Sequence, residues 1–213
     1  MTTATAIVFV IDDDQSVRKS LKRLLDANHY KTEVFKSASE FLSRSAYPEP
    51  SCVIVDVKMP GLNGIEFQEA LIEQGREEQL IFITAHGDIP MCAQAMKAGA
   101  VDFLPKPFRP SQLLESVERA LTRSSEQLLS ASERDNARAL LERLTPREYE
   151  VMQLVATGLL NKQVGGELGM AEKTVKTHRA HMMQKLKITS VAELMVILHK
   201  AEVSPPVKTG TKV

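Results

Sequence analysis

In the first half of the chain, short apolar runs alternate with stretches in which apolar residues recur at helical spacing. Residues 7–11 (Ile-Val-Phe-Val-Ile) are apolar without alternation, as expected of a strand covered on both faces. The pattern predicts five strands, at residues 7–11, 32–35, 52–56, 80–83 and 101–104. A helical pattern follows each strand, which indicates a parallel sheet with helices on both faces. The expected fold of this half is therefore a doubly wound, flavodoxin-like α/β domain with the strand order 2-1-3-4-5.

Capping and turn residues mark where the helices of this half begin and end. Ser37 and Glu40 form a capping box before a short helix, and Gly99 ends a helix that starts near Pro90. The helix expected from about Gly64 carries four apolar residues, namely Ile65, Ala70, Leu71 and Ile72. The last helix of this half has an apolar face of Leu113, Leu114, Val117 and Leu121.

From residue 145 the pattern changes to four short helices with tight joints. Thr145 and Glu148 form a capping box, with Pro146 at the first helical position. Asn161 is expected to cap a second helix that continues to Leu168. The remaining two helices are expected at residues 172–186 and 190–201.

Between these two patterns, residues 122–144 are rich in serine and charged side chains and contain neither glycine nor proline. We interpret them as a helical linker; a dimer seam is the alternative, but sustained heptads are absent. The C-terminal tail, with its proline, threonine and lysine residues, is expected to be disordered. The predicted organisation is an α/β domain at residues 1–123, a linker at 124–143, an all-α domain at 144–203 and a tail at 204–213.

The composition, with 43% hydrophobic and 25% charged residues, is that of an ordinary soluble protein. No segment has the pattern of a secretory leader or the length of a membrane span, which predicts a cytoplasmic protein. Cys52 and Cys92 lack the spacing of a metal site or a disulfide framework, so both are interpreted as reduced packing residues.

The zero net charge hides an asymmetry between the two halves. Residues 1–122 hold 13 Lys and Arg against 17 Asp and Glu, whereas residues 145–213 hold 10 against 6. The first half is acidic by 4 and the second is basic by 4. This difference predicts a cation or basic group as the partner of the first half and a polyanion as the partner of the second.

Acidic residues stand at the carboxyl ends of the first and third expected strands. Asp12 and Asp13 follow the first strand, and Asp56 ends the third. In a sheet of order 2-1-3-4-5 these strand ends are neighbours, so three carboxylates are expected to share one cleft and to need a cation. Hard oxygen ligands suit Mg²⁺, which predicts a magnesium site there. Taken alone, Asp56 could cap its own turn, and Asp14 could serve only as the cap of the first helix.

With the residues that end the fourth and fifth strands, residues 1 to about 123 resemble the receiver domain of bacterial two-component response regulators. The resemblance is carried by Asp12-Asp13, Asp56-x-x-Met59-Pro60-Gly61, Thr84-Ala85 and Lys106-Pro107. It implies that Asp56 accepts a phosphoryl group from a sensor histidine kinase. It also implies that Mg²⁺ is held by Asp12, Asp13, Asp56 and the backbone carbonyl of Lys58. The ammonium of Lys106 would neutralise the transferred oxygens on the other side.

The same resemblance implies a switch. The hydroxyl of Thr84 is expected to bond the phosphoryl group while the ring of Phe103 turns inward behind it; taken alone, Phe103 would be a core residue. The bond between Lys106 and Pro107 is expected to be cis, which would aim the lysine into the site. Lys58 and His86 stand at positions that tune the lifetime of the phosphoryl group in such proteins.

One predicted helix of the second half concentrates positive charge. It carries Lys173, Lys176, Arg179, Lys185 and Lys187 against the single acid Glu172. Charge of this density suits the phosphates of a nucleic acid, and a solvated basic face on a small bundle is the alternative. Residues 144 to 198 resemble the LuxR-type helix-turn-helix of the FixJ/NarL group through Leu144-Thr145-Pro146-Arg147-Glu148, Gly158-Leu159, Asn161-Lys162, Leu168-Gly169 and Lys173-Thr174-Val175-Lys176-Thr177-His178-Arg179.

By this resemblance the basic helix enters the major groove of DNA. Helical spacing favours base contacts for Lys176, Thr177 and Ala180, and phosphate contacts for Lys162, Lys173, His178 and Arg179. The role of His181 is left open. Three residues depart from the usual pattern, namely Leu160, Gly165 and Ala171. A glycine inside a helix and a lost cap each cost roughly 1 kcal/mol, so these departures predict a less rigid unit.

Together the two resemblances predict a transcriptional response regulator whose phosphorylation on Asp56 turns a monomer into a homodimer. The pairing surface is expected on the helix from Pro90 and the fifth strand, and the dimer would bind a two-fold related promoter site. No enzymatic activity is expected beyond self-phosphorylation from phosphohistidine and autodephosphorylation. One alternative is a constitutive dimer that works without phosphorylation. The other is a Mg²⁺-dependent phosphohydrolase, which usually has a second Asp where Lys58 stands.

Overall fold

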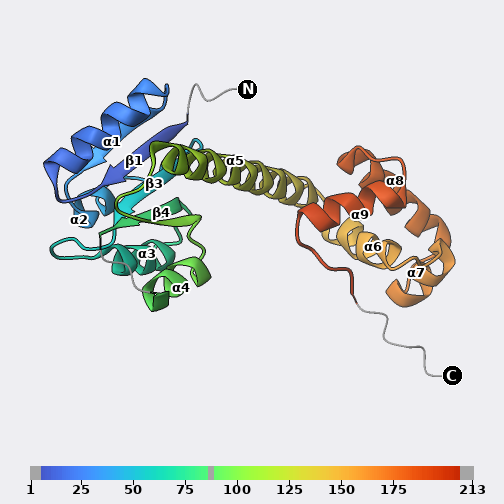
Figure 1. Cartoon of the computed structure of the whole chain (residues 1–213). Coiled ribbons are helices and arrows are strands. Elements are labelled where there is room, and N and C mark those ends of the chain that lie inside the picture. Colours follow the sequence, from blue (N-terminus) through green and yellow to red (C-terminus); the bar gives the residue numbers. More distant parts are fainter. Residues whose placement is uncertain (1–5, 86–88, 207–213) are drawn as a thin grey trace. The chain divides into compact units, whose positions relative to one another are not determined.

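The computed structural model describes residues 6–85 and 89–206. The chain divides into two compact units, residues 1–128 and residues 129–213, and each is described by itself (Figure 1). Among the described helices, none is both long enough and apolar enough to cross a membrane. The predicted tail beyond residue 206 and the predicted role of His86 lie outside the described residues.

The first unit is built on a five-stranded parallel sheet. Its strands are β1 (Ile7–Ile11), β2 (Lys31–Phe35), β3 (Ser51–Asp56), β4 (Gln79–Thr84) and β5 (Asp102–Pro105). The strand order β2-β1-β3-β4-β5 confirms the predicted doubly wound fold. β1 lies between β2 and β3, and Ile11 at its end is in register with Phe35 and Val55. Because all the strands are parallel, their carboxyl ends share one edge of the sheet.

Helices cover both faces of this sheet (Figure 1). They are α1 (Gln15–Ala27), α2 (Ala38–Leu42), α3 (Gly64–Glu73), α4 (Ile89–Lys97) and α5 (Pro110–Leu141). Alternate residues of β1 point to opposite faces, so Phe9 packs with Phe41 of α2 and Phe67 of α3, whereas Val8 packs with Leu25 of α1. Both faces of the central strands β1, β3 and β4 are therefore buried, which explains why these strands lack polar alternation.

One apolar position of α3 lies outside its buried face. Ile72 is 57% exposed, whereas Phe67, Gln68 and Leu71 are buried. The buried face follows the spacing from Gly64 through 67 and 68 to 71, and residue 72 falls beyond its edge.

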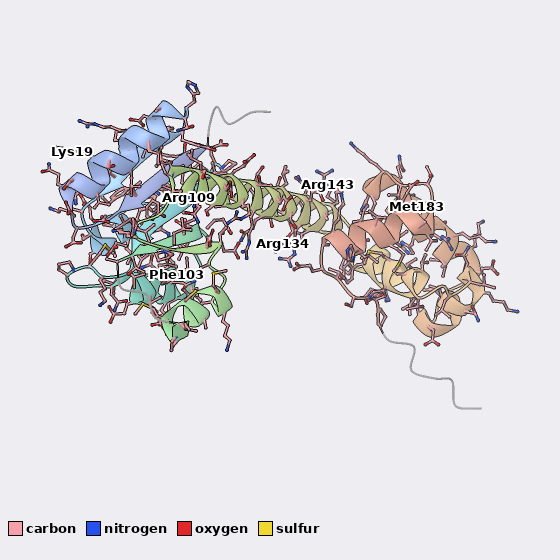
Figure 2. The ribbon with its side chains drawn as sticks, in the orientation of Figure 1. Lys19, Phe103, Arg109, Arg134, Arg143 and Met183 are labelled. Carbon is pink, nitrogen blue, oxygen red and sulfur yellow. The ribbon has the colours of Figure 1, made fainter. Side chains whose placement is uncertain are left out.

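The last predicted helix of the α/β domain and the predicted linker form one continuous helix, α5. Its first half packs on the sheet through Leu113 and Val117, and its last turns join the core of the second unit through Ala137 and Leu141. Near that end, Arg134 projects from α5 (Figure 2) and its guanidinium lies 3.6 Å from the carboxylate of Glu202. The predicted domain boundary at residues 123 and 124 thus falls inside a helix.

The second unit contains four short helices after the end of α5, as predicted. They are α6 (Pro146–Ala156), α7 (Asn161–Leu168), α8 (Glu172–Leu186) and α9 (Val191–Lys200). Their shared core includes Val151, Met152, Val164, Val175, Met182, Leu186, Leu194 and Leu198. The capping box of Thr145 and Glu148 at the start of α6 is confirmed.

The expected cap of α7 is wrong. Leu160 holds the N-cap position without a side-chain hydrogen bond, and Asn161 is the first residue inside the helix. The side chain of Asn161 instead accepts a hydrogen bond of 2.9 Å from Arg179 of α8. A tertiary contact has therefore taken the side chain that the local pattern assigned to a cap.

Gly165 has a packing role that its place inside a helix did not reveal. A Cβ atom at this position would lie 2.6 Å from the carbonyl oxygen of Met170 in the turn between α7 and α8. The absence of a side chain lets this turn close tightly on the helix. Glycine is expected to lower the stability of α7, but it allows two backbone segments to approach closely here.

Candidate functional site

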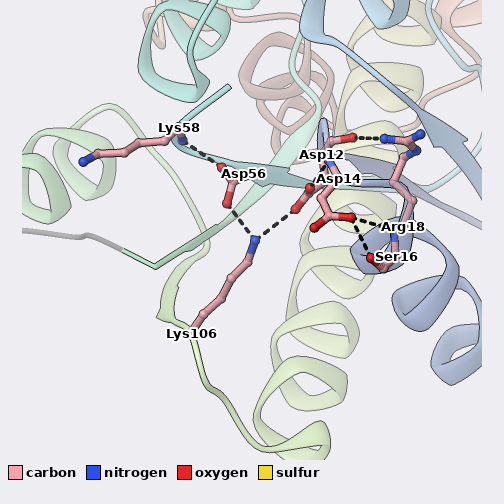
Figure 3. Close-up of polar contacts among 7 residues, drawn as sticks. All are labelled: Asp12, Asp14, Ser16, Arg18, Asp56, Lys58 and Lys106. Atoms are coloured by element: carbon pink, nitrogen blue, oxygen red, sulfur yellow. Dashed lines mark hydrogen bonds and ion pairs between the residues drawn. The ribbon is translucent and has the colours of Figure 1, made fainter. Parts of the chain in front are cut away.

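Two carboxylates and one ammonium group meet at the carboxyl edge of the sheet (Figure 3). Asp12 directly follows β1, Asp56 ends β3, and both side chains are buried. The Nζ atom of Lys106, which follows β5, lies 3.0 Å from Asp12 Oδ2 and 2.8 Å from Asp56 Oδ1. The fold therefore brings together three residues that are separated by 44 to 94 positions in the chain.

Backbone groups orient the two carboxylates. The amide of Asp14 donates to Asp12 Oδ1 at 2.9 Å, and the amide of Lys58 donates to Asp56 Oδ2 at 2.9 Å. Each carboxylate is thus held on one oxygen by a turn amide and on the other by Lys106. The geometry leaves little rotational freedom for either side chain, as a site for chemistry requires.

Two further residues shape this edge of the sheet, and the sequence analysis missed the role of both. Arg18 of α1 donates a hydrogen bond of 2.6 Å to the carbonyl oxygen of Asp12. Gly64 opens α3 so close to β3 that a Cβ atom there would lie 2.7 Å from the carbonyl oxygen of Asp56. Both contacts depend on the tertiary arrangement, and no local pattern in the sequence indicated either of them.

Burial and charge act on the protonation of this cluster. Burial raises the pKa of the Asp12 carboxyl above its ordinary value, although the hydrogen bond from Lys106 acts in the opposite direction. Burial also acts to lower the pKa of Lys106, but the hydrogen bonds and charges of Asp56 and Asp12 outweigh it, so this pKa is raised. Lys106 is therefore a firmly charged ammonium at neutral pH.

The donor set fits a hard divalent cation. Asp12 and Asp56 together carry two negative charges against one positive charge on Lys106, and Asp13 beside them is exposed. Within residues 6–85 and 89–206, no three His, Cys, Asp or Glu side chains are gathered as a ready-made metal cluster. Carboxylate oxygens are nevertheless the ligands that Mg²⁺ prefers, and Mg²⁺ commonly keeps several waters. The excess negative charge and the oxygen donors therefore suit Mg²⁺.

The remaining predicted residues lie around this cluster. Thr84 ends β4 and is buried, and Phe103 of β5 is half-buried with its ring 6.1 Å from that of Phe82. Lys58 is exposed, and its amide rather than its side chain contacts Asp56. The peptide bond between Lys106 and Pro107 is cis, as predicted.

The first acids also include one with a local role. Asp14 is the N-cap of α1, where its side chain accepts a hydrogen bond of 2.7 Å from the amide of Ser16. The interpretation of Asp14 as a helix cap is confirmed. The acidic run of residues 12–14 thus divides into a buried member, an exposed member and a cap.

The basic helix α8 exposes most of the residues predicted to contact DNA. Lys162 of α7 and Lys173, Lys176, Thr177 and Ala180 of α8 are exposed, whereas His178 and Arg179 are half-buried. Lys176 pairs with Glu172 one turn earlier at 2.9 Å, but both side chains remain accessible to solvent. An exposed pair of this kind is weak and leaves the ammonium available to a phosphate.

One lysine of α8 is not part of that exposed face. Lys185 Nζ donates to Glu148 Oε2 at 2.6 Å, and Glu148 is buried. The same carboxylate oxygen accepts from the amide of Thr145 at 2.8 Å, so one side chain caps α6 and binds α8. Although burial acts to raise it, the hydrogen bonds from Lys185 and Thr145 hold the pKa of Glu148 below its ordinary value. Lys185, one of the cations counted on this helix, is therefore held by a buried carboxylate and contributes to the fold.

Models of two protein families match the chain. The response regulator receiver domain matches residues 8–118, and the luxR family of bacterial regulatory proteins matches residues 142–198. The first match includes Asp12, Asp56 and Lys106, and the second includes the whole of α8.

Individual proteins are similar over nearly the whole chain. Nodulation protein W of Bradyrhizobium diazoefficiens is 47% identical over 190 residues, which cover 89% of this chain and 84% of that protein. The transcriptional regulatory protein FixJ of Azorhizobium caulinodans is 37% identical, with 93% of this chain and 94% of that protein covered. The solved structure of the response regulator StyR is 46% identical with a TM-score of 0.81, and the match covers 92% of this chain and 100% of StyR.

Proposed function

Because this chain belongs to the two-component response regulators that carry a receiver domain and a LuxR-type DNA-binding domain, we propose that phosphorylation of Asp56 controls its dimerisation and its binding to promoter DNA. The donor would be a sensor histidine kinase, and the protein would act in the cytoplasm. The observation that carries the proposal is the contact of Lys106 with both Asp12 and Asp56 at the carboxyl edge of the sheet.

The chemistry follows from the groups at this edge. A carboxylate oxygen of Asp56 would attack the phosphorus atom of a phosphohistidine, forming an oxygen–phosphorus bond as the nitrogen–phosphorus bond breaks. The imidazole leaves with the electron pair of the broken bond and takes a proton. Lys106 already touches Asp56 and carries a positive charge, so it can neutralise an oxygen of the transferred group with little movement. Thr84, at the end of the neighbouring strand, would donate its hydroxyl to another oxygen.

The residues proposed to hold Mg²⁺ are Asp12, Asp13, Asp56 and the backbone carbonyl of Lys58. When bound there, Mg²⁺ would supply positive charge to the transferred phosphoryl group in addition to that of Lys106. The amides of Asp14 and Lys58 prepare the site, because they fix the direction in which the two buried carboxylates present their oxygens.

The output is proposed to pass through α4 and β5. On α4, Ile89 is 85% exposed and Met96 is 42% exposed, so this helix offers apolar surface for pairing. β5 follows α4 in the chain, and its Phe103 is half-buried. A rearrangement of Thr84 and Phe103 on phosphorylation would favour a state in which this surface pairs with a second copy. The unphosphorylated protein would then be mostly monomeric.

A pair of α8 helices would occupy two major grooves of a two-fold related site. We assign base contacts to Lys176, Thr177 and Ala180, and phosphate contacts to Lys162, Lys173, His178 and Arg179. The exposure of the four lysine and threonine side chains among them supports this assignment. Arg179 would reach its phosphate while Asn161 holds one side of its guanidinium.

The test is light scattering with and without acetyl phosphate and Mg²⁺, together with selection of bound sequences from a random duplex DNA pool. Asp56→Asn removes the acceptor, and Asp26→Asn, which loses only an exposed pair with Lys22, is the matched control. The wild type and the control should dimerise and gain DNA affinity with the donor, and Asp56→Asn should do neither. Equal dimerisation of all three without donor would instead favour a constitutive dimer. Steady turnover of p-nitrophenyl phosphate would favour the phosphohydrolase.

A further inference from the structure

A polar network fastens the middle of α5 to the amino ends of β3 and β4. The amide of Ser51 donates a buried hydrogen bond of 3.0 Å to Ser124 Oγ. The side-chain amide of Gln79 donates to Gln127 Oε1 at 2.7 Å, and the side-chain amide of Gln127 donates to Glu77 Oε2. We call these five residues the linker latch. All of them belong to the first unit, and Ser124 and Gln127 lie where the sequence predicted the start of the linker.

The linker latch and the phosphorylation site occupy opposite ends of the same two strands. β3 begins at Ser51 and ends at Asp56, and β4 begins at Gln79 and ends at Thr84. Both strands are buried along their whole length, and each spans roughly 17 Å at about 3.3 Å per residue. A change at the carboxyl ends is therefore connected to α5 through two short, tightly packed strands.

The linker latch has the composition of a reversible contact. It consists of amide, hydroxyl and carboxylate groups, whose mutual hydrogen bonds exchange for bonds to water at a small net cost. A cleft of about 200 Å³ adjoins it, lined by Gln79, Arg123, Gln127 and neighbouring residues of α3 and of the loop after α4, and gives water a route to these groups. Gln79 is 6% exposed, and its Oε1 atom has no hydrogen-bond partner among the described residues. A partly satisfied polar network is a poor permanent fastening.

A second contact ties the same turn of α5 to the end of α4. Arg123 donates to the carbonyl oxygen of Gly99 at 3.3 Å, which is long for such a bond. Gly99 lies between α4 and β5, the elements assigned to the output surface. Residues 123–127 of α5 thus touch β3, β4 and the loop before β5 in one stretch of helix.

We propose that the linker latch transmits the phosphorylation state of Asp56 to α5, holding residues 123–127 on the sheet in the unphosphorylated protein and loosening when Asp56 is phosphorylated. This inference rests on the proposed function, because it concerns the route by which that signal leaves the receiver. Small displacements of packed strands produce discrete rearrangements at their far ends, since packed interiors do not deform continuously. A hydrogen bond of 2.7 Å between two glutamine side chains breaks after a shift of about an ångström.

The test compares amide hydrogen exchange at residues 123–127 in the full chain with and without Mg²⁺ and beryllofluoride, which stands in for the phosphoryl group. Beryllofluoride should raise exchange there about tenfold in the wild type. Gln127→Glu places a carboxylate opposite Glu77 and should raise exchange to a similar degree without beryllofluoride. It should also narrow the difference in DNA affinity between the two states to about twofold.

A second substitution makes the test specific. Adding Glu77→Gln to Gln127→Glu restores a donor opposite the new carboxylate, so the pair should recover wild-type exchange and wild-type regulation. Glu126→Ala, on the exposed neighbouring position of α5, is the matched control and should behave as the wild type. Thermal unfolding and phosphorylation by acetyl phosphate report whether each variant keeps a folded receiver.

Two results would overturn the role of the linker latch alone. One is a wild-type protein that dimerises with beryllofluoride while exchange at residues 123–127 stays unchanged. The other is a folded Gln127→Glu variant with raised exchange and undiminished regulation of DNA binding. A wild-type protein that neither dimerises nor gains DNA affinity with beryllofluoride would instead overturn the proposed function, and the signalling role of the linker latch with it.

Discussion

In the receiver unit the central charges of the candidate site are largely buried and paired, whereas the lysines assigned to DNA in the second unit are exposed and weakly held. Lys106 bridges Asp12 and Asp56 at the edge of the sheet, and backbone amides hold the far oxygens of both carboxylates. Lys176 touches only the exposed Glu172 one turn before it. Transfer of a phosphoryl group needs groups that are already in position, and binding of a polyanion needs cations that are free to meet phosphates.

The second unit also has a buried carboxylate, that of Glu148, which pairs with the partly exposed Lys185. The pair joins the start of α6 to the end of α8, so it sets how the basic helix is held. At the carboxyl edge of the receiver sheet the buried charges belong to the proposed reaction, whereas Glu148 in the second unit joins two helices.

Substitution of Lys106 by methionine should impair both the phosphorylation and the stability of the receiver. Lys106→Met leaves two carboxylates facing each other without a cation, so phosphorylation by acetyl phosphate should slow by at least about a hundredfold. Stability should fall by about 1 to 3 kcal/mol, because the lysine is partly buried between its partners. The exposed Lys176→Met should change stability by no more than about 0.5 kcal/mol and weaken only DNA binding. Chemical unfolding measures the stability of the two variants, and the rate of phosphorylation by acetyl phosphate measures the effect on the chemistry. Equal losses of stability in the two variants would contradict the contrast.

Removal of the Glu148 side chain should show that its pair with Lys185 stabilises the fold of the second unit. Glu148→Ala removes the reciprocal cap of α6 and leaves Lys185 without its partner, so stability should fall by about 2 kcal/mol. The control is Glu150→Ala, which loses only an exposed pair with Arg147. Unfolding of the second unit can be followed by circular dichroism in urea. A Glu148→Ala variant as stable as the control would rule out this role.

The pH dependence of stability should provide a second test of the stabilising role of Glu148. The pKa of Glu148 is held below its ordinary value of 4.5, so its ionised form stabilises the folded state above that pH. This contribution should be lost progressively as the pH falls below about 4.5 and through the lower pKa of the folded state. The stability difference between the wild type and Glu148→Gln should therefore be constant between pH 6 and 7 and shrink towards pH 3. A difference that grows with acidification would mean that the pKa is raised instead.

The smallest expected effect concerns Asn161. Asn161→Ala frees Arg179 from its hydrogen bond of 2.9 Å, so the guanidinium must be ordered when DNA binds. DNA affinity should fall roughly threefold with little change in stability. Fluorescence anisotropy with a selected duplex measures the affinity, and Gly166→Ala, at an open and exposed position of the same helix, is a suitable comparison. If Asn161→Ala binds DNA more tightly, Asn161 competes with the phosphate for the guanidinium of Arg179 and does not order this group for binding.

The order of elements and the edge that carries the site were determined by the sequence alone. Uninterrupted apolar runs predicted buried parallel strands because a strand covered on both faces needs no polar side. The topology then placed the carboxyl ends of β1 and β3 side by side, so the strand order alone predicted that Asp12 and Asp56 lie close together. The four helices of the second unit followed in the same way from caps and helical spacing.

Only the tertiary structure decided which polar side chains serve the surface and which serve the fold. Lys185 looked like one more cation of the basic helix, but it pairs with Glu148, which lies 37 residues earlier. Asn161 looked like a cap, but Arg179 of the next helix takes its side chain. Gly64, Arg18 and the linker latch likewise depend on partners contributed by other elements. Local periodicity reports which side of an element is buried, whereas a polar contact depends on what the rest of the chain places opposite it.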